Sequence, residues 1–88
     1  MYYICEWFDN YIVFNESKNK LSVTSGKSVK EAIKEYNKNT WNIRTQPERN
    51  IHISNSILYD VHIQHPVYFK TDNLDIDYII ETYPEFFI

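Results

Sequence analysis

The sequence has very few small residues and a single thiol: its 88 residues include one Gly, one Ala, three Pro and one Cys. Because glycine adopts unusual backbone angles most easily, this scarcity excludes a chain built on glycine-rich loops. A lone Cys5 excludes an internal disulfide and favours a reducing compartment such as the cytoplasm. Nothing near Cys5 in the sequence would activate it, so we expect an inert thiol in or beside the core.

Long apolar stretches are missing as well. Nowhere do the roughly 18 apolar residues that a transmembrane helix needs follow one another. The opening residues, MYYICEWFDN, lack the basic region and the apolar run of a secretory signal peptide. The sequence therefore predicts a cytoplasmic protein with no membrane association.

Each end of the chain lacks basic residues. Residues 1–17 carry three acids and no base, and residues 71–88 carry five acids and no base. Between them, residues 18–38 hold six Lys against Glu31 and Glu35, so the net charge of −3 conceals a basic middle between acidic ends. Such a layout can steer a charged partner toward one face, and it also serves solubility.

Aromatic residues are abundant: the chain has eight Tyr, five Phe and two Trp. A domain of this size buries only about 60–65% of its unfolded surface, so large side chains are needed to fill a core. Ile, Lys, Asn, Tyr and Phe make up nearly half of the chain, a bias typical of AT-rich coding in bacteria of low GC content and their phages. The composition predicts a single domain over residues 1–88.

The first half of the chain alternates apolar and polar residues before changing to helical spacing. We expect a hairpin formed by YYICEWF and YIVF, with its turn at Asp9-Asn10, and a third strand in KLSVTS. A helix over residues 28–37 follows, with its apolar residues three and four positions apart.

The second half predicts further strands and a second helix. Alternation in WNIRTQ, IHIS and ILYDVHIQ indicates strands, and PVYF would be an edge strand because Pro66 donates no hydrogen bond. The helix lies within TDNLDIDYIIETY, capped by Thr71 or Asp72 and stopped by Pro84. The expected fold is therefore α+β: a mainly antiparallel sheet of five to six strands, in the order three strands, helix, three strands, helix, with both helices on one face.

The segment TSGKS, residues 24–28, lies where a phosphate-binding loop would lie, between a strand and a helix. Such a loop needs another Gly five residues before Gly26, and that position is Leu21, within a strand. Ser28 and Glu31 instead match the S-x-x-E capping box, and Gly26 would supply a turn. The sequence thus predicts a capped helix start. The residues left as candidates for anion binding there are Lys27, Lys30 and Lys34.

No catalytic or metal-binding constellation is evident. His62 and His65 are three apart in an expected strand and would point to opposite faces, which with His52 favours surface or interface positions over a metal site. Asp75 and Asp77 would lie about 200° apart on a helix, so they do not converge as a catalytic acid and base would. We therefore expect no enzyme activity and no cofactor.

Residues 11–38, YIVFNESKNKLSVTSGKSVKEAIKEYNK, resemble the early part of HicB-type antitoxins, where a strand pair is followed by a Thr-x-Gly turn and a helix. The matching residues are Thr24, Gly26, Ser28, Val29, Glu31 and Ala32. NESKNK stands where that family usually carries an acidic, Pro- and Gly-rich loop. The resemblance covers about a third of the chain. It implies a toxin-neutralising protein that binds its partner through the sheet and helix, and it carries over no site residues.

These features together predict a small non-enzymatic protein-binding module. Its most concrete form is a phage or mobile-element inhibitor of a host macromolecule, of the anti-defence or anti-CRISPR type. The acidic C-terminal segment and its aromatic end are the predicted partner-binding residues: Asp72, Asp75, Asp77, Glu81, Glu85, Phe86 and Phe87. A partner matched to this face would be a basic, nucleic-acid-binding protein.

Three further interpretations stay open besides an enzymatic one, which the lack of a catalytic constellation disfavours. The first is a HicB-like antitoxin or regulator. The second is nucleic-acid binding through Lys30, Lys34 and Lys38, which the interleaved acids and the negative net charge disfavour. The third is a homo-oligomer, in which an exposed sheet edge or the aromatic tail pairs two copies.

Overall fold

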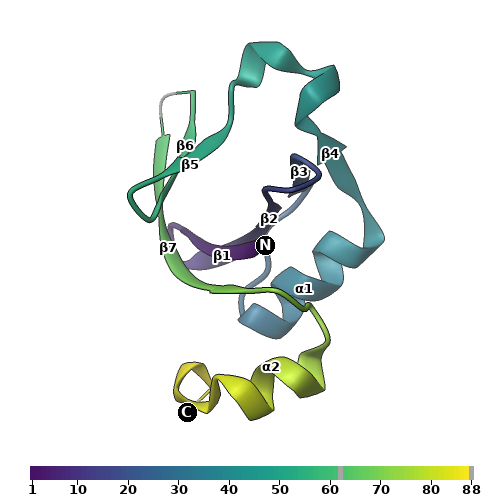
Figure 1. Ribbon diagram of the computed structural model, residues 1–88, viewed down its shortest axis with the longest axis vertical. Coiled ribbons are helices and arrows are strands. Elements are labelled where there is room, and N and C mark those ends of the chain that lie inside the picture. The colour runs from purple at the N-terminus through teal and green to yellow at the C-terminus, as the bar shows by residue number, and fades with distance from the viewer. Residues whose placement is uncertain (62, 88) are drawn as a thin grey trace.

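The computed structural model of this chain describes residues 1–61 and 63–87 and has the expected α+β architecture (Figure 1). Seven antiparallel strands form one curled sheet in the order β4-β3-β2-β1-β7-β6-β5. The elements are β1 (Tyr2–Trp7), β2 (Asn10–Asn15), β3 (Lys20–Ser22), α1 (Val29–Lys38), β4 (Thr40–Asn42), β5 (His52–Ser54), β6 (Ile57–Asp60), β7 (Ile63–Thr71) and α2 (Ile76–Thr82). The expected strand number of five to six was therefore too low.

The break between the last two strands comes earlier than expected, inside the segment ILYDVHIQ, which alternation predicts as one strand. The structure divides it into β6 and β7, which pair with Asp60 opposite Ile63. Val61 begins the turn with a φ of 50°, an angle that β-branched residues rarely adopt. Because neither Gly nor Asn marks this turn, the residue pattern gave no sign of it. Residue 62 lies outside the described residues, and with it the expectation for His62.

The expectation that PVYF forms an edge strand was wrong, because β7 lies between β1 and β6. Pro66 is tolerated there for a geometric reason. The amide of Val67 donates to the carbonyl of Ser56 beside β6, so the neighbouring Pro66 nitrogen points toward β1. The pairing with β1 ends at Cys5 opposite Val67, so no ladder donor is missing at Pro66.

Two other boundaries differ from the expected ones. The strand expected in WNIRTQ ends at Asn42, whose side chain accepts from the Arg44 amide at 3.1 Å and begins the 3₁₀ turn Ile43–Thr45. The second helix is capped by Asp75 rather than by Thr71 or Asp72, since the Asp75 carboxylate accepts from the Tyr78 amide at 3.1 Å. Both caps are short-range hydrogen bonds that compete with the preceding extended backbone.

The two faces of the sheet bury separate clusters. On one face, the helix-side core packs α1 and α2 against the strands and consists of Ile4, Val13, Val29, Ala32, Ile33, Phe69 and Ile79. On the other, concave face, the inner core consists of Cys5, Ile12, Phe14, Leu21, Ile43, Ile51 and Leu58. Figure 1 shows α1 and α2 on one side of the curl and the segment between β4 and β5 closing the other. Neighbouring residues of β1 and β2 thus serve opposite cores, as the two-residue period of a strand requires.

Cys5 is fully buried in the inner core, as expected. Burial raises the pKa of its thiol to about 12, because the thiolate would lose its hydration. In the described part of the chain, neither helix has the length and apolar character needed to cross a membrane.

Candidate functional site

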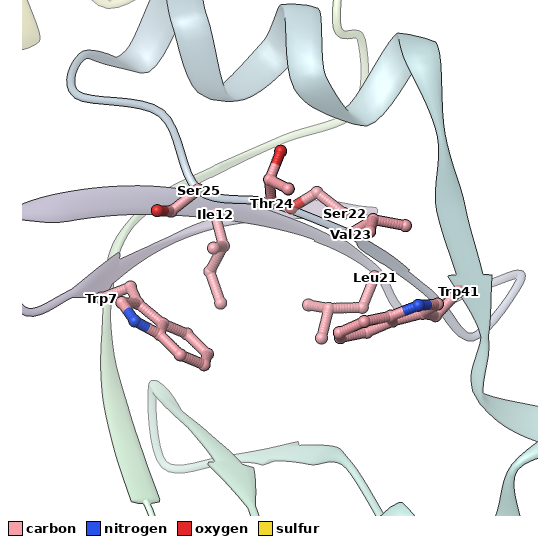
Figure 2. Close-up of a pocket in the computed structure, with 8 residues that line it drawn as sticks. All are labelled: Trp7, Ile12, Leu21, Ser22, Val23, Thr24, Ser25 and Trp41. Atoms are coloured by element: carbon pink, nitrogen blue, oxygen red, sulfur yellow. The ribbon is translucent and has the colours of Figure 1, made fainter.

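An aromatic cleft of about 310 Å³ opens beside the inner core. Figure 2 shows the indole rings of Trp7 and Trp41 extending toward each other from opposite sides, with the side chains of Ile12 and Leu21 between them. The segment Ser22 to Ser25 forms its rim. None of the residues that line the cleft is charged, so it is suited to an apolar group.

Strand register brings these side chains together. Trp7 follows Cys5 on the same face of β1, Cys5 lies opposite Ile12 in β2, and Leu21 of β3 lies opposite Trp41 of β4. All of them therefore project to the concave side of the sheet. Trp7 and Trp41 are far apart in sequence and line one cleft because they lie on the same face of the sheet, on strands separated by β2 and β3.

The rim exists because β3 stops early. The hydroxyl of Ser22 accepts from the Val13 amide at 3.1 Å and takes the place of a backbone partner. The chain returns to β2 at Gly26, which exchanges two hydrogen bonds with Tyr11 at 2.8 and 2.9 Å. The intervening residues bow out from β2 and border the cleft. Two rim hydroxyls are already engaged, since Asn10 donates to Ser25 and Thr24 donates to Glu35.

Each indole ring is held by a planar group stacked on it. The His65 ring lies 4.6 Å from the Trp7 ring at an angle of 11°, and the Arg49 guanidinium lies 4.2 Å from the centre of the Trp41 ring. Arg49 is fixed in turn by an ion pair of 3.0 Å with the buried Asp60. Both walls of the cleft are therefore positioned before any ligand arrives.

His65 is 1% exposed, contrary to the surface or interface position expected from the sequence. Its Nδ1 lies 3.2 Å from the carbonyl oxygen of Glu6, and since a carbonyl only accepts, Nδ1 carries the proton. Nε2 has no partner within the described residues. Burial is the main cause that lowers the pKa of His65, and it outweighs the opposing effects of Glu6 and Asp60. The ring stacked on Trp7 is thus neutral at pH 7.

Beside the cleft, an apolar tip is exposed at the end of the sheet. The first hairpin turns at Phe8 and Asp9 rather than at Asp9-Asn10, because Trp7 pairs with Asn10. Phe8 is 80% exposed, and its ring lies 6.2 Å from the Trp7 ring. With Ile63, which is 40% exposed, and Pro66, it borders a hollow of about 240 Å³. We call Phe8, Ile63 and Pro66 the apolar tip.

Phe8 also adopts a strained backbone, with a φ of 54°. For a residue with a Cβ atom this region costs roughly 1–2 kcal/mol, and glycine is the residue that usually occupies it. A large apolar side chain at such a position gains no burial that would offset the strain. The combination points to a role outside the folding of this chain.

The predicted acidic partner-binding residues lie on and around α2, across the helix-side core from the sheet. Asp77 and Glu81 lie on α2, and Glu85 lies in the 3₁₀ turn that follows; all five acids, including Asp72 and Asp75, are exposed. The ion pairs found among the described residues, Lys38–Glu35 and Arg49–Asp60, involve none of them. Two have structural duties, since Asp75 caps α2 and Asp72 accepts from the Tyr78 hydroxyl at 3.2 Å.

Phe86 and Phe87, predicted to bind a partner, pack against the helix-side core. The Phe86 ring stacks on Phe69 with centroids 4.7 Å apart and contacts Tyr68 edge to face at 4.9 Å. Both Phe residues remain partly exposed. One part of each side chain thus covers the core, and the other part is exposed at the surface.

The TSGKS segment forms a helix cap, as expected. Ser28 accepts from the Glu31 amide at 3.2 Å, and the Glu31 carboxylate accepts from the amide of Lys27 at 3.0 Å. The candidate anion-binding residues divide between two hollows: Lys27 and Lys30 border one with Phe86, and Lys34 borders another with Glu31 and Glu35. Two amides that would face an anion here are already bonded to side chains.

Among residues 1–61 and 63–87, no three His, Cys, Asp or Glu side chains gather as metal ligands would. His52 is exposed and stacks on Tyr59 with centroids 5.1 Å apart. The side chains that could bind a metal are thus dispersed over the described part of the chain.

Sequence reasoning missed Trp7, Trp41, Phe8 and Ile63 as site residues. Their apolar character made them candidates for the core, and no spacing rule separates a buried aromatic from one that lines a surface cleft. Alternation did not reveal Phe8 either, because turns at Phe8-Asp9 and at Asp9-Asn10 differ by two residues in register and leave the same side chains on each face.

Comparison of the chain with known protein families, characterised proteins and solved structures finds no match. The resemblance of residues 11–38 to HicB-type antitoxins therefore stays a prediction from the residues alone.

Proposed function

We propose that this protein is a small non-enzymatic module that binds another protein through the aromatic cleft and the adjoining apolar tip. The observation that carries the proposal is Phe8, an aromatic side chain that is 80% exposed on a backbone with a φ of 54°. Aromatic residues of this kind dominate the binding energy of protein interfaces. Ile63 and the hollow beside it extend the same surface.

Charge supports a partner of basic character. Asp72, Asp75, Asp77, Glu81 and Glu85 are exposed and stand outside the ion pairs of the described residues. Unpaired acids of this kind speed the approach of a basic protein more than they add to its final affinity. The apolar tip would then supply most of the affinity.

The most concrete form of this function is an inhibitor of a host macromolecule, encoded by a phage or a mobile element. It would be of the anti-defence type and would act by covering the surface of its target. The AT-rich composition, the small size and the basic partner implied by the acids support it. A single buried thiol supports action in the reducing cytoplasm.

The test compares capture of a partner by three immobilised forms of the protein: wild type, Phe8→Gly and Lys34→Ala. Host lysate is applied at physiological salt. We expect wild type and Lys34→Ala to retain the same partner and Phe8→Gly to retain at least tenfold less, the loss typical of an interface hot spot. Lys34→Ala is the matched control because Lys34 lies on α1, on the opposite side of the sheet.

Urea unfolding of the same variants separates binding from folding. Glycine relieves the positive φ at residue 8, so Phe8→Gly should be as stable as wild type or up to about 1 kcal/mol more stable. A partner that Phe8→Gly retains as well as wild type would rule out the apolar tip. Retention of no protein by the wild type would count against the function itself.

A further inference from the structure

We infer that the aromatic cleft is a socket for one neutral aromatic side chain, Phe or Tyr in character, presented by the partner protein. This inference rests on the proposed function and names the chemistry of the contact. It starts from the size of the cleft: about 310 Å³ lies at the lower limit of ligand pockets, so it holds one side chain rather than a cofactor.

The walls favour a planar apolar group. Trp7 and Trp41 approach from opposite sides with Ile12 and Leu21 between them (Figure 2). A ring placed there contacts two indoles, and aromatic pairs in offset or edge-to-face contact are more favourable than their buried area alone would give. Neither indole needs to move, because His65 and Arg49 already hold the two rings.

Arg49 excludes the obvious alternative, a cation in an aromatic cage. Such cages work because the negative faces of aromatic rings attract a positive charge. The Arg49 guanidinium already lies 4.2 Å from the centre of the Trp41 ring, so one wall carries a positive charge of its own. The Trp41 ring is thus already used by one cation, whose charge Asp60 balances, and no carboxylate lines the cleft to attract a second.

The lining also disfavours a nucleobase. Bases that stack in protein grooves bring phosphates with them, and binding them takes Lys or Arg along the groove. No Lys or Arg is among the residues that line the cleft, and Arg49, behind Trp41, is engaged by Asp60. A protein side chain brings no such charge, which leaves an aromatic residue of the partner as the fitting occupant.

The composition provides a direct assay. Trp7 and Trp41 are the two Trp residues of the chain, and both line the cleft, so a joint shift of their two indole N–H signals in a ¹⁵N-resolved NMR spectrum reports binding in the cleft. Binding at the apolar tip would reach only Trp7, through its contact with Phe8. The probe is N-acetyl-phenylalanine methylamide. Its matched controls are the cyclohexylalanine analogue, which keeps size but not aromaticity, and tetramethylammonium chloride, which supplies the cation.

We expect saturable shifts of both indole signals with the phenylalanine probe and binding about two- to tenfold weaker with the cyclohexyl analogue, the difference that aromatic contacts provide. Tetramethylammonium should leave both signals unchanged. In Trp41→Leu, the Trp7 signal should no longer shift. The wild-type comparison of the three probes stands even if that variant fails to fold.

Binding of the cation, equal binding of the two amide probes, or no binding of the phenylalanine probe would each overturn the inference. A sedimenting dimer that Phe8→Gly abolishes would assign the socket to a second copy of this chain and would overturn it too. If a partner is captured through Phe8 but none of the probes binds the cleft, the proposed function is retained and only this inference is refuted.

Discussion

His65 ties the aromatic cleft to the stability of the fold. Its ring supports Trp7 from behind, its Nδ1 donates to the carbonyl of Glu6, and the ring is almost wholly buried. A proton on Nε2 would place a positive charge where no described residue accepts a hydrogen bond from it. For this reason burial lowers the pKa of His65.

The lowered pKa predicts a loss of stability in mild acid. Unfolded, His65 takes up a proton near its ordinary pKa of about 6.5, whereas folded it does so only at lower pH, so the unfolded state binds more protons between the two values. The free energy of unfolding should therefore be unaffected by His65 above about pH 6.5 and should fall as the pH drops below it.

Urea midpoints at pH 7.5 and 5.5 measure this effect. Other ionisable groups also contribute to the pH dependence of stability, so the comparison is between variants: His65→Phe should show a smaller drop than wild type, because a ring without a titratable nitrogen remains on Trp7. His52→Gln is the control, since His52 is exposed and should leave the drop unchanged. Equal drops in all three proteins would show that His65 does not titrate differently on folding.

At the scale of elements, one close approach fixes how the sheet meets α1. Gly26 forms an isolated bridge with Tyr11 of β2 and lies directly beside the first turn of α1. The sequence suggested that Gly26 supplies an unusual turn conformation, but it has no positive φ. Its lack of a side chain matters instead: a Cβ atom there would lie 2.3 Å from the Ala32 nitrogen and 2.5 Å from the Glu31 carbonyl carbon.

Gly26→Ala should therefore destabilise the protein by about 3 kcal/mol, at the upper end of what overpacking costs, because rigid backbone rather than a side chain must move. Urea unfolding measures the change. Ser28→Ala is the control within the same segment: it removes one capping bond and should cost only about 1 kcal/mol. A Gly26→Ala protein no less stable than Ser28→Ala would refute the close approach.

At the scale of the whole molecule, the two cores lie on opposite faces of one sheet, and the same strands contribute side chains to both. Ile4 and Cys5 are adjacent in β1, yet Ile4 belongs to the helix-side core and Cys5 to the inner core. If either core were lost, one face of these strands would be exposed to water, and the strands would no longer support the other core. The molecule should therefore unfold as a single unit.

Two probes test this cooperativity, because they report on opposite faces. Trp fluorescence follows the inner side, where both indoles lie, and far-ultraviolet circular dichroism follows α1 and α2. Leu58→Ala in the inner core and Ile79→Ala in the helix-side core should each cost about 2–5 kcal/mol. Each variant should shift both probes to the same new urea midpoint. Separate midpoints would mean that the two cores unfold independently.

The sequence by itself determined the local elements, because their causes are local. The spacing of Val29, Ala32 and Ile33 specifies the buried face of α1, Ser28 marks its start, and two-residue alternation specifies which side chains of β1 and β2 share a face. From these followed the α+β class, the placing of both helices on one face, and the burial of Cys5.

Tertiary structure alone decided the long-range pairings and everything built from them. The turn at Val61 and the central position of Pro66 depend on hydrogen bonds between β7 and its two neighbours, which no local pattern encodes. The cleft depends on the register of four strands that brings Trp7 to Trp41. Residue types and periodicity describe what one segment prefers, whereas a surface site is set by which segments the curl of the sheet places side by side.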